Sequence, residues 1–157
     1  MVAFCDLIEE RAIKAAKDYG TADAKVYTDY KELLKDESID VCYVLTPNRS
    51  HAEISIDSLH AGKHVMCEKP LALTREDLEA IIACTKKYDT KFMVGQICRF
   101  TPAFKKAKEM IENGEIGEVT KVEAFTDRPI WPQGLERPKE VQAVPPTPHW
   151  EAFIGPA

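Results

Sequence analysis

The 157-residue chain has no long apolar run. Asp6, Glu9 and Glu10 interrupt its first apolar residues, and no later stretch approaches the roughly 20 residues that span a bilayer. We therefore expect neither a membrane helix nor a signal peptide. The chain also lacks a basic cluster, because its net charge of −5 is spread along its length. A nucleic-acid partner is not expected from this pattern.

The five cysteines include no CxxC pair, and the four histidines do not cluster with them. This spacing does not predict a metal site, which needs several ligands close together. Three of the cysteines fall inside apolar, strand-like runs. We therefore predict reduced, buried thiols in a cytoplasmic protein. The cysteines are Cys5, Cys42, Cys67, Cys84 and Cys98.

What the chain does have is an alternation of strand and helix patterns, which predicts a doubly wound parallel α/β fold. The run Ile39–Leu45 is almost continuously apolar, as expected of a strand covered on both faces. The other predicted strands are Val2–Cys5, Lys25–Tyr27, Lys63–Cys67 and Lys91–Gly95. The predicted helices are Leu7–Tyr19, Asp29–Leu34, Asn48–Ala61, one capped by Thr74, and Thr101–Glu112 with Phe104, Ala107 and Ile111 inward.

After residue 117 the pattern changes. Glu118–Phe125 is strand-like, and seven of the ten prolines fall between residues 127 and 157. A stretch so rich in proline indicates a long loop that lies on another part of a protein.

The carboxyl ends of parallel strands meet at one edge of a sheet, and ligands bind there. Asp6 follows the first strand, where an acidic residue can bind the ribose of a dinucleotide or simply cap the next helix. Such an acid normally lies about 20 residues after a GxGxxG loop. The seven glycines form no GxG. The segment Thr46-Pro47-Asn48-Arg49-Ser50-His51 follows the most apolar strand, and Asn48 is either a ligand of phosphate or ribose or only a cap.

Two further segments end strands at the same edge. Glu68 and Lys69 form either a surface ion pair of little energy or a group that holds a hydroxyl and moves a proton. Arg99 either binds an acidic substrate or ties together a domain junction. The residues alone leave these alternatives open.

The run TPNRSHAEISIDSLHAGKHVMCEKPLALT, residues 46–74, resembles the central signature of the glucose–fructose oxidoreductase, inositol dehydrogenase and rhizopine-catabolism (Gfo/Idh/MocA) family. AFCDLIEERAIKAAKDYG resembles its second strand and helix, and DRPIWPQGLERP resembles a sugar-related branch. The resemblance implies an enzyme that transfers hydride between nicotinamide and a sugar or polyol. Residues 1–117 would form its NAD(P)-binding Rossmann domain, and residues 118–157 would begin a second, substrate-binding α/β domain.

The resemblance also implies roles for individual residues. Asp6 would hold the adenosine ribose and favour NAD over NADP. Lys69 would be the catalytic lysine, following a Glu68 that approaches the nicotinamide ribose, and the Lys69–Pro70 bond would be cis. The remaining cofactor-binding residues would be Thr46, Pro47, Asn48 and His51 in the groove, with Gln96 and Arg99 at the domain junction.

The sequence departs from the family in two ways. It lacks the first strand with its glycine loop, and the later segment that carries an aspartate and a histidine; His149 does not match that segment. We therefore expect a fragment truncated at both ends, from a parent that forms a homo-oligomer. The absent strand would lie between Val2–Cys5 and Ile39–Leu45, leaving both with unpaired edges. The alternatives are a non-catalytic nucleotide- or partner-binding module, and a member that uses NAD to cleave glycosidic bonds.

Overall fold

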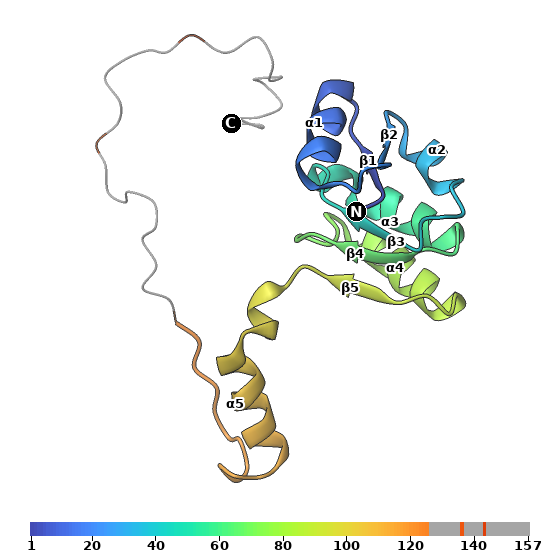
Figure 1. Ribbon diagram of the computed structural model, residues 1–157. Helices are drawn as coiled ribbons and strands as arrows, with labels where there is room; N and C mark the ends of the chain where they lie inside the picture. The colour runs from blue at the N-terminus through green and yellow to red at the C-terminus, as the bar shows by residue number, and fades with distance from the viewer. Residues whose placement is uncertain (126–135, 137–142, 144–157) are drawn as a thin grey trace. The chain divides into compact units, whose positions relative to one another are not determined.

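The computed structural model describes residues 1–125, 136 and 143 (Figure 1). The chain divides into two compact units, residues 1–117 and 118–157, and each is considered by itself. Among the described residues, no helix is both long enough and apolar enough to cross a membrane. The proline-rich stretch from residue 127, His149 included, falls almost entirely outside the described residues.

The first unit contains five short parallel strands in two sheets. The strands β1 (Ala3–Cys5) and β2 (Lys25–Tyr27) form one sheet. The strands β3 (Val41–Val44), β4 (His64–Cys67) and β5 (Phe92–Val94) form the other, with β4 in the middle. Parallel strands joined through helices confirm the predicted α/β class. In the described part of the chain, β1 and β3 do not pair, as predicted for a sheet without its central strand.

The helices begin and end close to the predicted positions. They are α1 (Glu9–Tyr19), α2 (Tyr30–Leu34), α3 (His51–His60), α4 (Arg75–Lys87) and α5 (Pro102–Glu112), with single 3-10 turns η1 (Asn48–Ser50) and η2 (Ile97–Phe100). Thr74 caps α4 by accepting a hydrogen bond from the backbone N–H of Asp77 at 3.1 Å, as the sequence predicted. Gly20 ends α1 with a 2.8 Å bond from its N–H to the carbonyl of Ala16.

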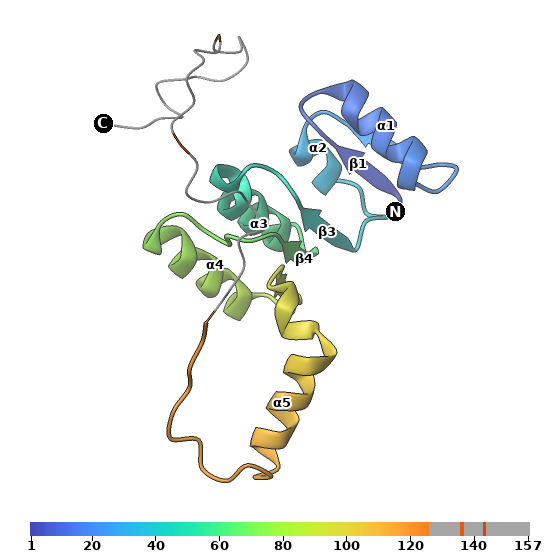
Figure 2. The ribbon, with the colours of Figure 1, turned by 90° about the vertical axis from the view of Figure 1, so that its left-hand side faces the viewer.

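The core lies between the sheet β3–β4–β5 and the helices α3 and α4, which pack side by side on one face of that sheet (Figure 2). Alternate residues of the strands point to this face. They meet Leu59 of α3, which has no exposed surface. The buried members of this cluster are Val44, Leu59, Val65 and Cys67.

Four expectations about burial and structure were wrong. Cys42 and Cys67 are buried as predicted, but Cys98 is exposed, because it lies on the exposed 3-10 turn η2. The strand β3 is covered on one face only: Val41 remains 57% exposed and Tyr43 45% exposed, because α3 and α4 both lie on the opposite face. The apolar side of α5 is also exposed, because α5 packs against η2 and not against a sheet. Its residues are Phe104, Ala107 and Ile111. Glu118–Phe125 forms no strand, although its sequence is strand-like.

A polar cluster joins β2 to the turn that precedes β3. The Asp36 carboxylate accepts hydrogen bonds from Lys25 at 2.6 Å and Tyr27 at 2.9 Å, and from the backbone and hydroxyl of Ser38. These contacts, the one from Lys25 first, hold the pKa of Asp36 well below its ordinary 3.8. Because the pKa is lowered in the folded state, the stabilisation is present above 3.8 and is lost as the pH falls below it.

We predict that Leu59→Ala lowers the free energy of unfolding by about 2–5 kcal/mol, because it leaves a cavity in the core. Urea unfolding followed by circular dichroism measures the change. Leu73→Ala is the matched control, since Leu73 is 60% exposed, and it should change stability by less than about 1 kcal/mol. Equal losses in the two variants would mean that the core lies elsewhere.

We predict that Asp36→Asn destabilises the chain at neutral pH, and that its deficit relative to the wild type shrinks as the pH falls below 3.8. Unfolding curves measured from neutral to acid pH test this. Glu37→Gln changes an exposed neighbouring carboxylate and should show no such convergence. A deficit for Asp36→Asn that is the same at every pH would contradict the assignment.

Candidate functional site

The register of β3, β4 and β5 brings three strand ends together. Val44 pairs with Cys67, and Cys67 pairs with Val94. The ladder continues one residue further, since the N–H of Glu68 donates to Val44 at 3.0 Å and that of Gly95 donates to Cys67 at 2.7 Å. The candidate residues that follow these strands therefore lie at one edge of the sheet. They are Thr46, Glu68, Lys69 and Gln96.

The turn after β3 is held by its own polar groups. The Ser50 hydroxyl donates to the Thr46 hydroxyl at 2.8 Å, and the Ser50 N–H donates to the carbonyl of Pro47 at 2.9 Å. The side chain of Asn48 is exposed and caps no helix, so the capping alternative for Asn48 is not realised. The side-chain amide of Asn48 therefore makes no capping hydrogen bond at this edge of the sheet.

His51 lies behind this turn rather than at its surface. Its side chain is buried, with 1% exposure. Nδ1 lies 2.7 Å from the carbonyl oxygen of Pro70, and Nε2 lies 2.7 Å from that of Thr46. The ring thus bridges the turn after β3 and the loop after β4. Because the ring is buried and both nitrogens lie next to backbone carbonyls, His51 does not contact a ligand directly. It supports the turn and the loop that can do so.

Glu68 is fixed from three sides at the end of β4. Oε1 accepts a hydrogen bond from the Tyr43 hydroxyl at 2.9 Å, and Oε2 accepts one from the backbone N–H of Lys69 at 3.1 Å. The third neighbour is Gly95, where an added Cβ would lie 3.0 Å from Oε2. The hydrogen bond from Tyr43, then that from Lys69, lower the pKa of Glu68, and the charges of Lys69 and His51 act in the same direction.

Lys69 itself is exposed, and the Lys69–Pro70 bond is cis, as expected. The surface ion pair, one of the two alternatives left open for Glu68 and Lys69, is not formed; the Glu68 carboxylate accepts a hydrogen bond from the backbone N–H of Lys69 instead. The ammonium group is therefore available at the strand ends. Cys67, which precedes this pair, is buried, and burial raises the pKa of its thiol, so it is no nucleophile here.

Asp6 lies at the end of β1, in the other sheet of the same unit. Its Oδ1 accepts a 2.9 Å hydrogen bond from the N–H of Ile8, the residue that precedes α1. Among the described residues, Oδ2 has no hydrogen-bond partner and can accept one from a ribose hydroxyl. Gln96 and Arg99 are exposed around η2, where the Arg99 N–H donates to the Gln96 carbonyl at 3.0 Å.

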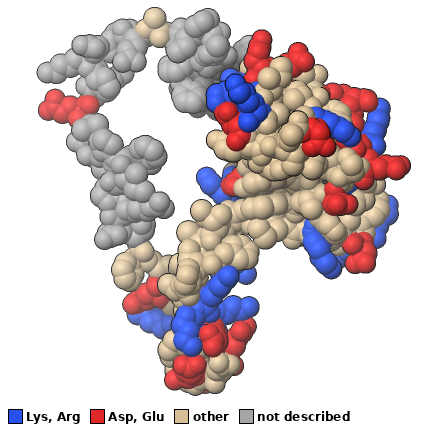
Figure 3. Space-filling view, in the orientation of Figure 1, with Lys and Arg blue, Asp and Glu red and all other residues tan. Residues whose placement is uncertain are grey.

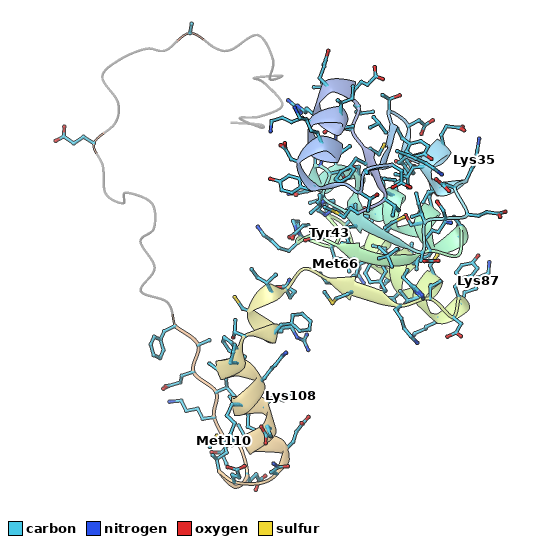
Figure 4. The ribbon with its side chains drawn as sticks, viewed as in Figure 1. Lys35, Tyr43, Met66, Lys87, Lys108 and Met110 are labelled. Atoms are coloured by element: carbon cyan, nitrogen blue, oxygen red, sulfur yellow. The ribbon has the colours of Figure 1, made fainter. Side chains whose placement is uncertain are left out.

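Sequence reasoning missed two residues of this arrangement, Tyr43 and Gly95. The signal for Tyr43 is present in the chain, because alternation places it on the same face as Met66 and Glu68 once the parallel register is known. Figure 4 shows Tyr43 and Met66 close together on neighbouring strands. A Cβ at position 95 would lie 3.0 Å from Oε2 of Glu68, so the carboxylate would have to shift to accommodate a side chain there.

The described residues include no group of three or more His, Cys, Asp or Glu that could hold a metal ion. Acidic and basic side chains are mixed over the face of the molecule seen in Figure 3. The arrangement offers instead a carboxylate at one strand end, and a carboxylate with an exposed lysine at another. The glycine-rich loop that grips a pyrophosphate is not among these 157 residues.

Residues 1–96 match the profile of the GFO_IDH_MocA family, described as an oxidoreductase family with an NAD-binding Rossmann fold. The chain belongs to this family. The recognised signature thus predicted the family correctly, together with its NAD-binding α/β fold.

Known members of the Gfo/Idh/MocA family resemble the chain over most of its length. Inositol 2-dehydrogenase of Salmonella paratyphi B is 35% identical over 119 residues, which are 75% of this chain and 35% of the relative. Levoglucosan dehydrogenase of Pseudarthrobacter phenanthrenivorans is 40% identical over 110 residues, 70% of this chain and 28% of the relative. The chain thus spans about a third of the length of these relatives.

A solved structure supports the same assignment. Scyllo-inositol dehydrogenase from Lactobacillus casei, with bound NAD(H) and scyllo-inositol, superposes with a TM-score of 0.68 at 27% identity. The match covers 76% of this chain and 35% of that one.

We predict that His51→Ala lowers the free energy of unfolding by about 2–4 kcal/mol, because the bridge from the buried ring to the carbonyls of Thr46 and Pro70 is lost and a cavity forms. His60→Ala is the control on the same helix, since His60 is exposed. Chemical unfolding of both variants measures the difference. If both variants lose a similar, small part of the free energy of unfolding, the contacts of His51 with the two carbonyls do not stabilise the fold.

Proposed function

We propose that this chain is the cofactor-binding part of an NAD-dependent dehydrogenase that acts on an alcohol carbon of a sugar or polyol. The observation that carries the proposal is the convergence of Glu68, Lys69 and the turn Thr46–Asn48 at one sheet edge in a chain of this family. Relatives named for inositol and levoglucosan support the substrate class. Residues 1–117 form the nucleotide domain in this proposal, and residues 118–157 begin the substrate domain.

Asp6 binds the adenosine end of the cofactor in this proposal. Its free carboxylate oxygen accepts from a ribose hydroxyl, and its charge repels the additional phosphate of NADP. NAD is therefore the preferred cofactor. Asn48 and the backbone of Thr46 and Pro47 line the groove along the strand ends, while His51 supports that turn from behind.

Glu68 and Lys69 contact the nicotinamide end of the cofactor and the substrate. Bound nicotinamide supplies the acceptor for the hydride that leaves the substrate carbon. The Lys69 ammonium, exposed at the strand end, donates a hydrogen bond to the substrate hydroxyl oxygen and supports the transfer of the hydroxyl proton to a separate base. Glu68 orients Lys69 through its backbone N–H and retains lone pairs for a ribose hydroxyl. Gln96 and Arg99 lie beside this edge at the junction towards the second domain.

The parent protein, in this proposal, is a cytoplasmic homo-oligomer, and its second domain supplies the substrate pocket. The short chain offers only part of the cofactor site, so its affinity is expected to be weak. A non-catalytic module would bind the nucleotide but would not oxidise a substrate. Binding and turnover are therefore tested separately.

We predict that the chain binds NADH in preference to NADPH, and that Asp6→Ala lowers the NADH affinity about tenfold, which corresponds to about 1.4 kcal/mol. Fluorescence titration with each nucleotide measures both constants. Asp23→Ala is the control, an exposed carboxylate in the loop before β2. Equal binding of both nucleotides, or an Asp6→Ala variant indistinguishable from the control, would remove the adenosine-site assignment. No binding of either nucleotide would remove the proposal for this chain.

A further inference from the structure

The exposed face of β3 brings Tyr43 to the end of β4. Tyr43 pairs with Met66 in the parallel register, and Glu68 lies two residues further along the same face. Diagonal neighbours on adjacent strands are within reach of a long aromatic side chain. The Tyr43 hydroxyl accordingly donates to Oε1 of Glu68 at 2.9 Å. The hydrogen bond between Tyr43 and Glu68 thus depends on the register of β3 and β4 rather than on the conformation of the loop after β4.

The Glu68 side chain has little freedom to leave this position. Tyr43 holds Oε1, and the Lys69 N–H holds Oε2 at 3.1 Å. Behind Oε2, the position of a Cβ on Gly95 is only 3.0 Å away, so the carboxylate lies almost against the backbone of the neighbouring strand. The carboxylate thus has a hydrogen-bond donor at each oxygen, with Gly95 of the neighbouring strand close to Oε2.

The charges around Glu68 agree with this geometry. The Tyr43 hydrogen bond is the largest cause of the lowered pKa of Glu68, and the same bond raises the pKa of Tyr43. The other groups that face the carboxylate are the backbone and charge of Lys69 and the charge of His51. Glu68 is therefore ionised at neutral pH, and a charge-assisted hydrogen bond is the stronger kind.

We propose that Tyr43 is a positioning residue of the site: its hydroxyl holds the Glu68 carboxylate against the backbone of Lys69, and so fixes the direction in which Lys69 leaves the strand. The inference rests on the function proposed above and adds a residue to it. Tyr43 itself need not touch a ligand. Its effect passes through Glu68 to the backbone of the lysine.

The first test is the titration of Glu68 in Tyr43→Phe, followed by carbon-detected NMR of its carboxyl group and by the amide signal of Lys69. We expect the pKa of Glu68 to rise toward that of an ordinary glutamate, and the Lys69 amide to lose part of its pH response. Tyr27→Phe is the matched control, because Tyr27 also donates to a carboxylate at 2.9 Å, that of Asp36. It should leave Glu68 unchanged.

Gly95→Ala provides an independent second variant. Its methyl group should displace the carboxylate and disturb the same two signals without removing any hydroxyl. A Tyr43→Phe variant in which Glu68 titrates as in the wild type would overturn the proposal, since Tyr43 would then only pack on the sheet. Movement of Glu68 in the Tyr27→Phe control would overturn it equally, because the effect would then not come from the local contact.

NADH affinity separates this inference from the proposed function. We expect Tyr43→Phe to weaken NADH binding by about three- to tenfold, the range expected for one oriented hydrogen bond. If Glu68 responds to the substitution but neither protein binds NADH, the role of Tyr43 stands and the proposed function fails. If the wild type binds NADH and Tyr43→Phe changes neither titration nor affinity, the proposed function stands and the role of Tyr43 fails.

Discussion

The parallel register of β3, β4 and β5 is the constraint on which the rest of the structure depends. It pairs Val44 with Cys67 and Cys67 with Val94, so that the three strands end together. Strand alternation then assigns each residue to a face. Cys67 enters the core below Leu59, while its neighbour Glu68 faces the open edge. Because core and site occupy consecutive positions of one strand, a shift of register by one residue would exchange them.

The helix α3 joins this core to the site. Its last turn contributes Leu59, which is fully buried, and its first residue, His51, contacts the carbonyls of Thr46 and Pro70. The turn after β3 and the loop after β4 are thus held by the helix that also fills the core. Rigid support of this kind suits a site whose groups must keep fixed distances. It also explains why His51, although close to the site, is enclosed by protein.

Much of this could be predicted from the sequence, because alternation and strand ends are local signals. The strands, the cap at Thr74 and the meeting of Glu68, Lys69 and Thr46 at one edge follow from pattern and parallel topology. The sequence could not predict which element, if any, packs against each apolar face. The apolar run of β3 and the stripe of α5 indicate a face but not its partner, and one face of β3 and the apolar side of α5 remain exposed. The contact from His51 to the carbonyl of Pro70, 19 residues further along the chain, depends on the tertiary fold, for which the sequence has no local signal.

The two ends of the proposed cofactor site depend on different contacts. Glu68 and Lys69 belong to the sheet β3–β4–β5, whereas Asp6 belongs to β1–β2, and no strand ladder joins the sheets in the described residues. Side chains connect them instead: the Tyr30 hydroxyl of α2 donates to Asp57 at 2.7 Å and to Glu53 at 3.0 Å, both on α3. Hydrogen bonds between exposed or half-buried side chains are individually weak. A dinucleotide that contacts both ends would itself help to hold the two sheets together, because a ligand that binds only the folded arrangement stabilises it.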